Sequence, residues 1–148
     1  MRVIAYDPYP SEIAAGVTMC NLKTVMTEAD VVSLHCPLTA DNRKMINGET
    51  LGFMRDGAIL INTARGGLVD EQALLQALQS GKLRAVGLDT FATEPFSLSH
   101  PFSGIPNVIL TPHIGGVTSD AYVSMGTAAA RNILETLREP VLSQQGEN

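Results

Sequence analysis

Two short motifs in the last third of the chain could together perform acid–base chemistry. Glu94 stands before a proline in a loop-like segment, and His113 stands in the stretch TPHIGG, residues 111–116. A histidine paired with a carboxylate is the commonest acid–base device near neutral pH, because the carboxylate fixes the imidazole tautomer and stabilises its charged form. A lone histidine is more often structural, and we assign His35 and His100 to that class.

A third chemical group is the guanidinium of Arg65, which lies in the stretch NTARGG, residues 62–67. Arginine offers a planar fork of donors that matches a carboxylate, and neighbouring glycines let the backbone approach a ligand closely. A solvent-exposed arginine in a flexible loop would fit the same local sequence equally well. The motif therefore indicates a carboxylate site only in combination with the groups above.

Short apolar runs, alternating with helix-like segments, must position these groups. The runs predict five buried strands, over residues 2–6, 31–36, 58–62, 86–88 (or from 83) and 108–111. Between them we expect a brief helix capped by Ser11 and ending at Gly16, and helices over 22–28, 71–80 and 119–137. Residues 39–54 are expected to be helical in pieces, with a break near Asn47 and Gly48.

Near-continuously apolar strands that alternate with helices imply a parallel sheet covered on both faces. The expected fold is therefore α/β, a Rossmann-like doubly wound parallel sheet, and in such sheets ligands bind at the carboxyl ends of the strands. Four polar residues stand just beyond strand ends, namely Asp7, Arg65, Asp89 and His113. We expect one crevice to collect them.

The size and composition fit one globular domain. The chain has 148 residues, 45% hydrophobic and 17% charged, and we expect one domain over 1–140 and a loose tail over 141–148. The net charge of −5 comes without a basic cluster, which argues against nucleic-acid binding. Cys20 and Cys36 fit neither a disulfide framework nor a metal site. We recognise no membrane span or secretory signal, and we expect a cytoplasmic location.

The motifs taken together resemble those of the D-isomer-specific 2-hydroxyacid dehydrogenase family, which includes phosphoglycerate dehydrogenases, glyoxylate/hydroxypyruvate reductases and D-lactate dehydrogenases. They follow the family's order and spacing from Met1 to the final predicted helix. The matching stretches are VIAYDPY, ADVVSLHCPLT, GAILINTARGGLVDEQALLQALQSGKL, GLDTFATEP and NVILTPHIGG. The resemblance implies the NAD-binding domain of an enzyme that transfers a hydride between NAD(H) and a D-2-hydroxy acid or 2-keto acid.

The resemblance also implies roles for individual residues. Arg65 would bind the substrate carboxylate and carbonyl, and His113 would exchange a proton with the 2-hydroxyl. Glu94 would hydrogen-bond His113 and raise its proton affinity, which should favour reduction at mildly acidic pH and oxidation at alkaline pH. Asp7 would hold the adenosine ribose and repel a 2′-phosphate, selecting NAD over NADP, although an Asp before a proline often only makes a turn.

The remaining cofactor-binding positions follow from the same resemblance. Cys36 and Pro37 would line the adenine side, and the backbone of Thr63 and Ala64 would run beside the cofactor. Asp89, Gly115 and Gly116 would lie near the nicotinamide, which Arg65 and His113 would also contact.

The chain also departs from the family pattern. No G-x-G-x-x-G motif occurs in the sequence. In the family this motif precedes the position of Met1, so we expect an incomplete fold that lacks the first strand, the glycine-rich loop and its helix. The absent strand would lie between residues 2–6 and either 31–36 or 58–62, in the strand order 3-2-1-4-5-6. Residues 1–140 would then be a partial NAD-binding domain, a fragment that is poorly stable, binds NAD weakly and shows no detectable turnover alone.

A function of another class stays open. Corepressors use the same fold as a non-catalytic NAD-binding module, and they can keep all three catalytic residues. The choice of 2-hydroxy acid is also open, because the separate substrate domain would read most of its side chain. The resemblance further implies a homodimer in the full-length form, with a small 2-hydroxy or 2-keto acid, and neither nucleic acid nor membrane, as partner.

Overall fold

The computed structural model describes residues 1–97 and 99–138. The tail predicted over 141–148 lies outside the described residues. The chain divides into two compact units, of which the first covers Met1–Gly115 and the second begins at Gly116. All the strands and the predicted catalytic residues belong to the first unit.

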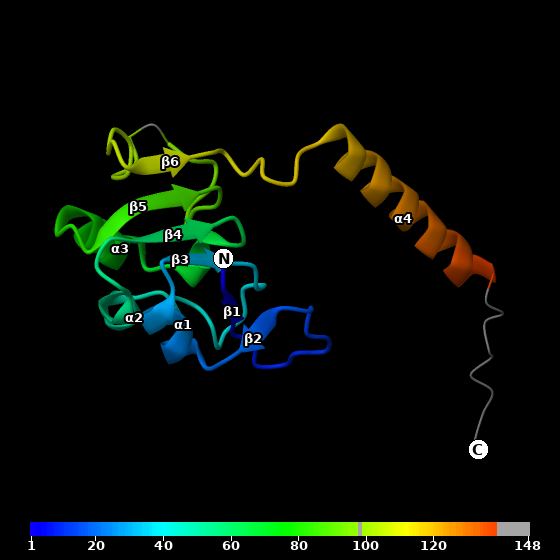
Figure 1. Ribbon diagram of the computed structural model, residues 1–148. Coiled ribbons are helices and arrows are strands. Elements are labelled where there is room, and N and C mark those ends of the chain that lie inside the picture. The colour runs from blue at the N-terminus through cyan, green and yellow to red at the C-terminus, as the bar shows by residue number, and fades with distance from the viewer. Residues whose placement is uncertain (98, 139–148) are drawn as a thin grey trace, which may run out of the picture. The chain divides into compact units, whose positions relative to one another are not determined.

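Four parallel strands form the main sheet of the first unit, in the order β3-β4-β5-β6 (Figure 1). Their inward side chains are almost wholly buried, as Leu60 and Val86 illustrate. All four strands were predicted from their apolar runs, with ends that differ by up to two residues, apart from β5, which begins at the earlier of its two predicted starts. They are β3 (Val31–Leu34), β4 (Ala58–Asn62), β5 (Leu83–Leu88) and β6 (Val108–Leu110).

A second parallel sheet pairs β1 (Val3–Ala5) with β2 (Val17–Met19). Among the described residues, β1 and β3 each have one strand neighbour. In the doubly wound order 3-2-1-4-5-6, the pair β2-β1 and the run from β3 flank the place of the central strand. Of the two neighbours that the sequence left open, β4 already has β3 and β5 on its two sides, so only β3 has an edge on which the expected strand could pair.

The brief helix predicted from Ser11 to Gly16 is wrong. The structure shows a turn there, in which the Val17 amide donates to the Ala14 carbonyl and Gly16 adopts a φ of +84°. Every side chain from Ser11 to Gly16 is exposed, so a helix here would have no buried face to stabilise it. The segment leads instead into β2, a three-residue strand too short to stand out as an apolar run.

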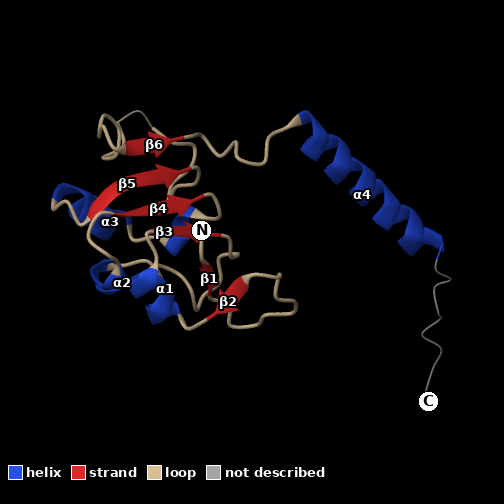
Figure 2. Ribbon diagram, in the orientation of Figure 1, coloured by secondary structure: helices blue, strands red, loops and turns tan. Residues whose placement is uncertain are grey.

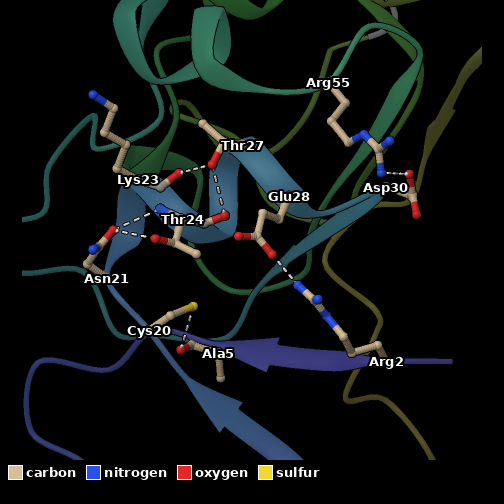
Figure 3. A network of polar contacts seen from close by, with 10 residues as sticks. All are labelled: Arg2, Ala5, Cys20, Asn21, Lys23, Thr24, Thr27, Glu28, Asp30 and Arg55. Atoms are coloured by element: carbon tan, nitrogen blue, oxygen red, sulfur yellow. Dashed lines mark hydrogen bonds and ion pairs between the residues drawn. The ribbon is translucent and has the colours of Figure 1, made fainter.

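Capping side chains define the helices of the first unit. Helix α1 (Leu22–Glu28) begins after Asn21, whose side chain accepts a hydrogen bond from the Thr24 amide, and an ion pair joins Glu28 to Arg2 before β1 (Figure 3). Helix α3 (Glu71–Gln79) begins after Asp70, and Gly81 beyond its end has a φ of +75°. Both helices were predicted, with α1 at its observed bounds.

The prediction of helical pieces over 39–54 holds only for its second half. Helix α2 (Gly48–Phe53) begins after Asn47, but residues before it form turns. The Lys44 amide donates to the Gly67 carbonyl at 2.8 Å, and the Ile46 amide donates to the Leu68 carbonyl at 3.0 Å. These bonds to residues more than twenty positions away, around the short 3-10 helix η1 (Gly66–Leu68), replace the local bonds of a helix.

The second unit is described by itself and contains helix α4 (Ser119–Arg138), close to the predicted 119–137 (Figure 2). None of its described side chains is buried. Within the described residues, no helix combines the length and apolar character that crossing a bilayer requires. In the first unit, Cys20 and Cys36 are both free and half-buried.

Candidate active site at the carboxyl ends of the strands

The loop that follows β4 carries Arg65 and is shaped by Asn62, the last residue of that strand. Asn62 is fully buried, its carbonyl oxygen Oδ1 accepts from the Ala64 amide at 3.0 Å, and its Nδ2 donates to the Arg65 carbonyl at 2.9 Å. A buried amide satisfied on both sides holds a backbone in one conformation. This role was not predicted from the sequence, where its signal is a polar residue that ends an otherwise apolar strand.

Gly66 brings this loop against the loop that follows β5. A Cβ added to Gly66 would lie 1.9 Å from the carbonyl carbon of Phe91 and 2.5 Å from the amide nitrogen of Ala92. Only glycine therefore fits, and its role in the structure is close packing of backbone on backbone rather than approach to a ligand. The contact sets Arg65 beside the loop that carries Glu94.

Glu94 and His113 form the predicted acid–base pair. Nδ1 of His113 lies 2.9 Å from Oε2 of Glu94, and the other carboxylate oxygen accepts from the Phe91 amide at 3.0 Å. The hydrogen bond to His113, followed by the bond from Phe91 and the charges of His113 and Arg65, lowers the pKa of Glu94 against the opposing effect of burial. The carboxylate is thus ionised at neutral pH and fixes one face of the imidazole, while Nε2 has no hydrogen-bond partner among the described residues.

Asp89, the first residue after β5, holds the turn that carries His113. It is 4% exposed and accepts from Oγ1 of Thr111 at 2.5 Å and from the amides of Ile114 and Gly115, each at 2.9 Å. Burial alone would raise the pKa of Asp89, but these hydrogen bonds outweigh it and hold that pKa below its ordinary value. His113 itself has a φ of +57°, in the left-handed region, between the residues that Asp89 binds.

The three predicted catalytic residues line one cavity of about 340 Å³. Arg65 is exposed, and its guanidinium donates to the Ala64 carbonyl at 2.6 Å. The cavity therefore gathers a cation, a carboxylate and an imidazole from the loops after three successive parallel strands. Its lining is Leu38, Arg43, Arg65, Gly66, Gly67, Phe91, Ala92, Glu94 and His113.

The predicted cofactor positions are spread along the same strand ends. Cys36 and Pro37 follow β3, Thr63 and Ala64 follow β4, and Gly115 lies against Asp89, where an added Cβ would come within 2.9 Å of Oδ2. Exposed or half-buried small residues at neighbouring strand ends suit a flat ring system that lies across them. The residues present thus fit a bound dinucleotide, with Cys36 and Pro37 on the expected adenine side and Gly115 on the expected nicotinamide side.

Two predicted cofactor residues are set apart. Asp7 follows β1 in the two-stranded sheet, is exposed, and accepts from the Tyr9 amide at 2.8 Å, which is the turn conformation that the sequence offered as its alternative role. Gly116 begins the second unit, so its place relative to the cavity is not described.

The loop that carries Glu94 has its own anchor, which the sequence reasoning also missed. Oε1 of Glu71, in the first turn of α3, accepts from the Ala92 amide at 2.8 Å, and Oε2 lies 3.4 Å from Nε2 of His100. The His100 ring packs among Phe91, Phe96 and Phe102, with ring centroids 5.1 to 5.5 Å away. His100 therefore has a structural environment, as we predicted.

Comparison with known proteins agrees with this arrangement. Residues 1–115 match the family model of the D-isomer specific 2-hydroxyacid dehydrogenase, NAD binding domain. The chain belongs to this family. The fold and the family resemblance predicted from the sequence are confirmed.

Individual dehydrogenases of the family align with most of this chain. It is 42% identical to a hydroxypyruvate reductase of Thermotoga maritima over 139 residues, which are 93% of this chain and 45% of the relative. A D-3-phosphoglycerate dehydrogenase of Methanocaldococcus jannaschii is 43% identical over 142 residues, 93% of this chain and 27% of its own. The chain thus spans at most about half the length of these curated relatives.

A solved structure of the family superimposes closely. The NAD-complexed D-isomer specific 2-hydroxyacid dehydrogenase of Lactobacillus delbrueckii ssp. bulgaricus has a TM-score of 0.85 and 36% identity, over 93% of this chain and 46% of that one. The strand ends that carry Arg65, Glu94 and His113 are therefore part of a fold seen with NAD in a relative.

Proposed function

We propose that this domain supplies the NAD site and the catalytic residues of an oxidoreductase that interconverts D-2-hydroxy acids and 2-keto acids. The observation that carries the proposal is the convergence of Arg65, Glu94 and His113 on one cavity, with the His113–Glu94 pair at 2.9 Å. An imidazole oriented by a carboxylate and set beside a guanidinium is suited to proton transfer on a substrate that carries its own carboxylate.

Each of the three residues has a definite task in this reaction. Nε2 of His113, which faces no protein partner among the described residues, takes the proton of the substrate 2-hydroxyl during oxidation and returns it during reduction. Glu94 holds the ring through Nδ1 and stabilises its charged form. Arg65 pins the substrate carboxylate, which fixes the face of C2 that reacts.

NAD, when bound, supplies the hydride acceptor, and NADH the donor. We assign Cys36, Pro37, Thr63, Ala64 and Gly115 to its contacts because they follow the carboxyl ends of β3, β4 and β6, where ligands of such sheets bind. Asp89 lies at the nicotinamide side but also positions His113 through Ile114 and Gly115. Asp7 and Gly116 are assigned from the family resemblance alone.

Reduction of a panel of 2-keto acids by NADH, followed by the loss of NADH absorbance, tests the proposal. Arg65→Gln and His113→Asn should each lower kcat/KM about 100-fold or more, because each removes a group that acts in the transition state. Arg84→Gln is the matched control, since Arg84 is exposed at the opposite end of β5.

Two results would count against the proposal. Undiminished turnover in Arg65→Gln or His113→Asn would refute the roles of these residues. Tight NADH binding without turnover of any 2-keto acid, in the protein with all its domains, would favour the non-catalytic NAD-binding module instead. Weak NADH binding by the 148-residue chain alone is the expected result.

We also propose that the full-length protein is cytoplasmic and, from the family resemblance, that it is a homodimer. Its partners would be a small 2-hydroxy or 2-keto acid and NAD, with neither nucleic acid nor membrane among them. Light scattering coupled to size-exclusion chromatography measures the oligomeric state directly.

A further inference from the structure

A second guanidinium, that of Arg43, lines the same cavity as Arg65. Its Nη1 lies 3.6 Å from the point where a Cβ on Gly67 would stand, so the side chain extends over the glycine loop toward the site. Because Gly67 has no side chain, nothing on that residue separates the Arg43 guanidinium from the cavity.

The backbone on both sides of Arg43 is held firmly. On one side, Nδ2 of Asn42 donates to the Pro37 carbonyl at 2.7 Å. On the other, Lys44 adopts a φ of +53°, its amide donates to the Gly67 carbonyl, and its Nζ lies 3.1 Å from Asp70. These constraints direct the Lys44 ammonium to the start of α3 and leave the Arg43 side chain to the cavity.

The charges that line the cavity are unbalanced. Arg43 and Arg65 are cations, and the Glu94 carboxylate is already bound to His113 and to the Phe91 amide. Among the described residues, Arg43 has no hydrogen bond or ion pair through its side chain, in contrast to Lys44, Arg55 and Lys82. A substrate with one carboxylate on Arg65 would leave the charge of Arg43 uncompensated.

We propose that Arg43 is a specificity-determining residue that binds a second anionic group at the far end of the substrate. The preferred substrates are then 2-hydroxy and 2-keto acids with a distal carboxylate or phosphate, in preference to acids with one charge. Either anion suits a guanidinium, which binds both through two parallel hydrogen bonds. The inference depends on the proposed function, because it takes Arg65 as the site of the first carboxylate.

Matched pairs of 2-keto acids that differ in their distal charge test this inference. One pair is 2-oxoglutarate and 2-oxovalerate, and the other is hydroxypyruvate phosphate and hydroxypyruvate. The wild type should have a higher kcat/KM for the doubly charged member than for the singly charged member of at least one pair. The pair that shows this preference identifies the distal group as a carboxylate or a phosphate. Arg43→Gln should lower kcat/KM for that member about fivefold to twentyfold and leave its singly charged match within about twofold.

Direct binding is measured beside the kinetics, because we expect no detectable turnover from the 148-residue chain alone. Isothermal titration of the chain with 2-oxoglutarate, 2-oxovalerate and 3-phosphoglycerate reports the same preference without chemistry. Arg43→Lys keeps the charge and should retain part of the preference, while Arg84→Gln should leave it unchanged. Added salt should weaken binding of the doubly charged acid more than binding of the singly charged acid, since screening acts on both of its anionic groups.

The outcomes separate this inference from the proposed function. No preference for either doubly charged acid, or an equal effect of Arg43→Gln on both members of a pair, would overturn the role of Arg43 and leave that of Arg65 intact. If Arg43→Gln lost NADH affinity and kept its acid preference, Arg43 would be assigned to cofactor binding, and the inference would again be overturned. Normal binding of every acid in Arg65→Gln would instead refute the proposed function itself.

Discussion

At the scale of single residues, the site depends on two carboxylates with different environments. Glu94 is about one-third exposed and binds the imidazole, whereas Asp89 is 4% exposed and binds the turn that carries the imidazole. Hydrogen bonds lower the pKa of both groups. Glu94 is therefore available to respond to charge on His113, while Asp89 serves mainly to keep His113 in place.

The pKa of Glu94 leads to a prediction about stability and pH. A carboxyl group whose pKa is lower in the folded state than in the unfolded state stabilises the fold above its unfolded pKa. That contribution fades as the pH falls through the folded value. Glu94→Gln should therefore be less stable than the wild type above about pH 5, by at most about 1 kcal/mol because the group is partly exposed, and the difference should shrink below about pH 4.

Urea unfolding at a series of pH values measures this difference. Glu12→Gln makes the same change of charge at an exposed carboxylate that has no polar partner among the described residues. A constant gap between Glu94→Gln and the wild type across the acid range would contradict the prediction.

At the scale of elements, the site is built by loops that pack on one another at the ends of parallel strands. Asn62 shapes the loop after β4, Gly66 seats it on Phe91 and Ala92, and Glu71 holds the loop after β5 from the side of α3. These contacts join loops through their backbones, so we expect a small change at one of them to displace the side chains of Arg65 and Glu94 several residues away.

Gly66→Ala should be strongly destabilising. The added methyl group would stand 1.9 Å from the Phe91 carbonyl carbon, and one of the two backbones must move. We expect a loss of about 3 kcal/mol in the free energy of unfolding, measured by thermal or urea denaturation.

Gly52→Ala in α2 is the matched control. A Cβ at Gly52 would meet nothing within 4 Å, and alanine is favoured over glycine inside a helix by up to about 1 kcal/mol. This variant should be as stable as the wild type or more so. Equal stabilities of Gly66→Ala and Gly52→Ala would show that the two loops are not in the close contact described.

The elements also show what the sequence could and could not predict. Apolar runs located β3 to β6, the capping residue Asp70 located α3, and a helix-like segment located α1, because these signals are local. The turn at Lys44 and the strand β2 escaped prediction, since one depends on hydrogen bonds to Gly67 and Leu68 and the other is three residues long. The meeting of Arg65 and His113 was predictable from parallel strands, and the pairing of Glu94 with His113 followed from the family resemblance. The side-chain direction of Arg43 was not predictable, because it follows from that same unpredicted turn.

At the scale of the whole molecule, the strands fall into a sheet of two and a sheet of four. Strands β4 and β5 have neighbours on both sides, while β1 and β3 each have one among the described residues. The apolar side chains that begin these two strands are partly open to solvent, with Val3 40% and Val31 49% exposed. Backbone groups along such edges exchange with water more easily than those inside a sheet.

Hydrogen exchange should reveal this difference within one sample. In the 148-residue chain, amides of β1 and β2 should exchange at least about tenfold faster than those of β4 and β5, as measured by mass spectrometry of peptide fragments. Equal protection of the two sets would mean that the sheets open together as one cooperative unit, contrary to this expectation.

The left-handed backbone at His113 lowers the stability of the turn at the residue to which we assign the proton transfer. A residue with a Cβ is strained by roughly 1 kcal/mol in the left-handed region. Glycine has no such strain, and asparagine has less of it. The fold accepts this local penalty at the residue that must present an imidazole. A more stable version of this turn is therefore easy to make by mutation, and it would lack the imidazole to which we assign the proton transfer.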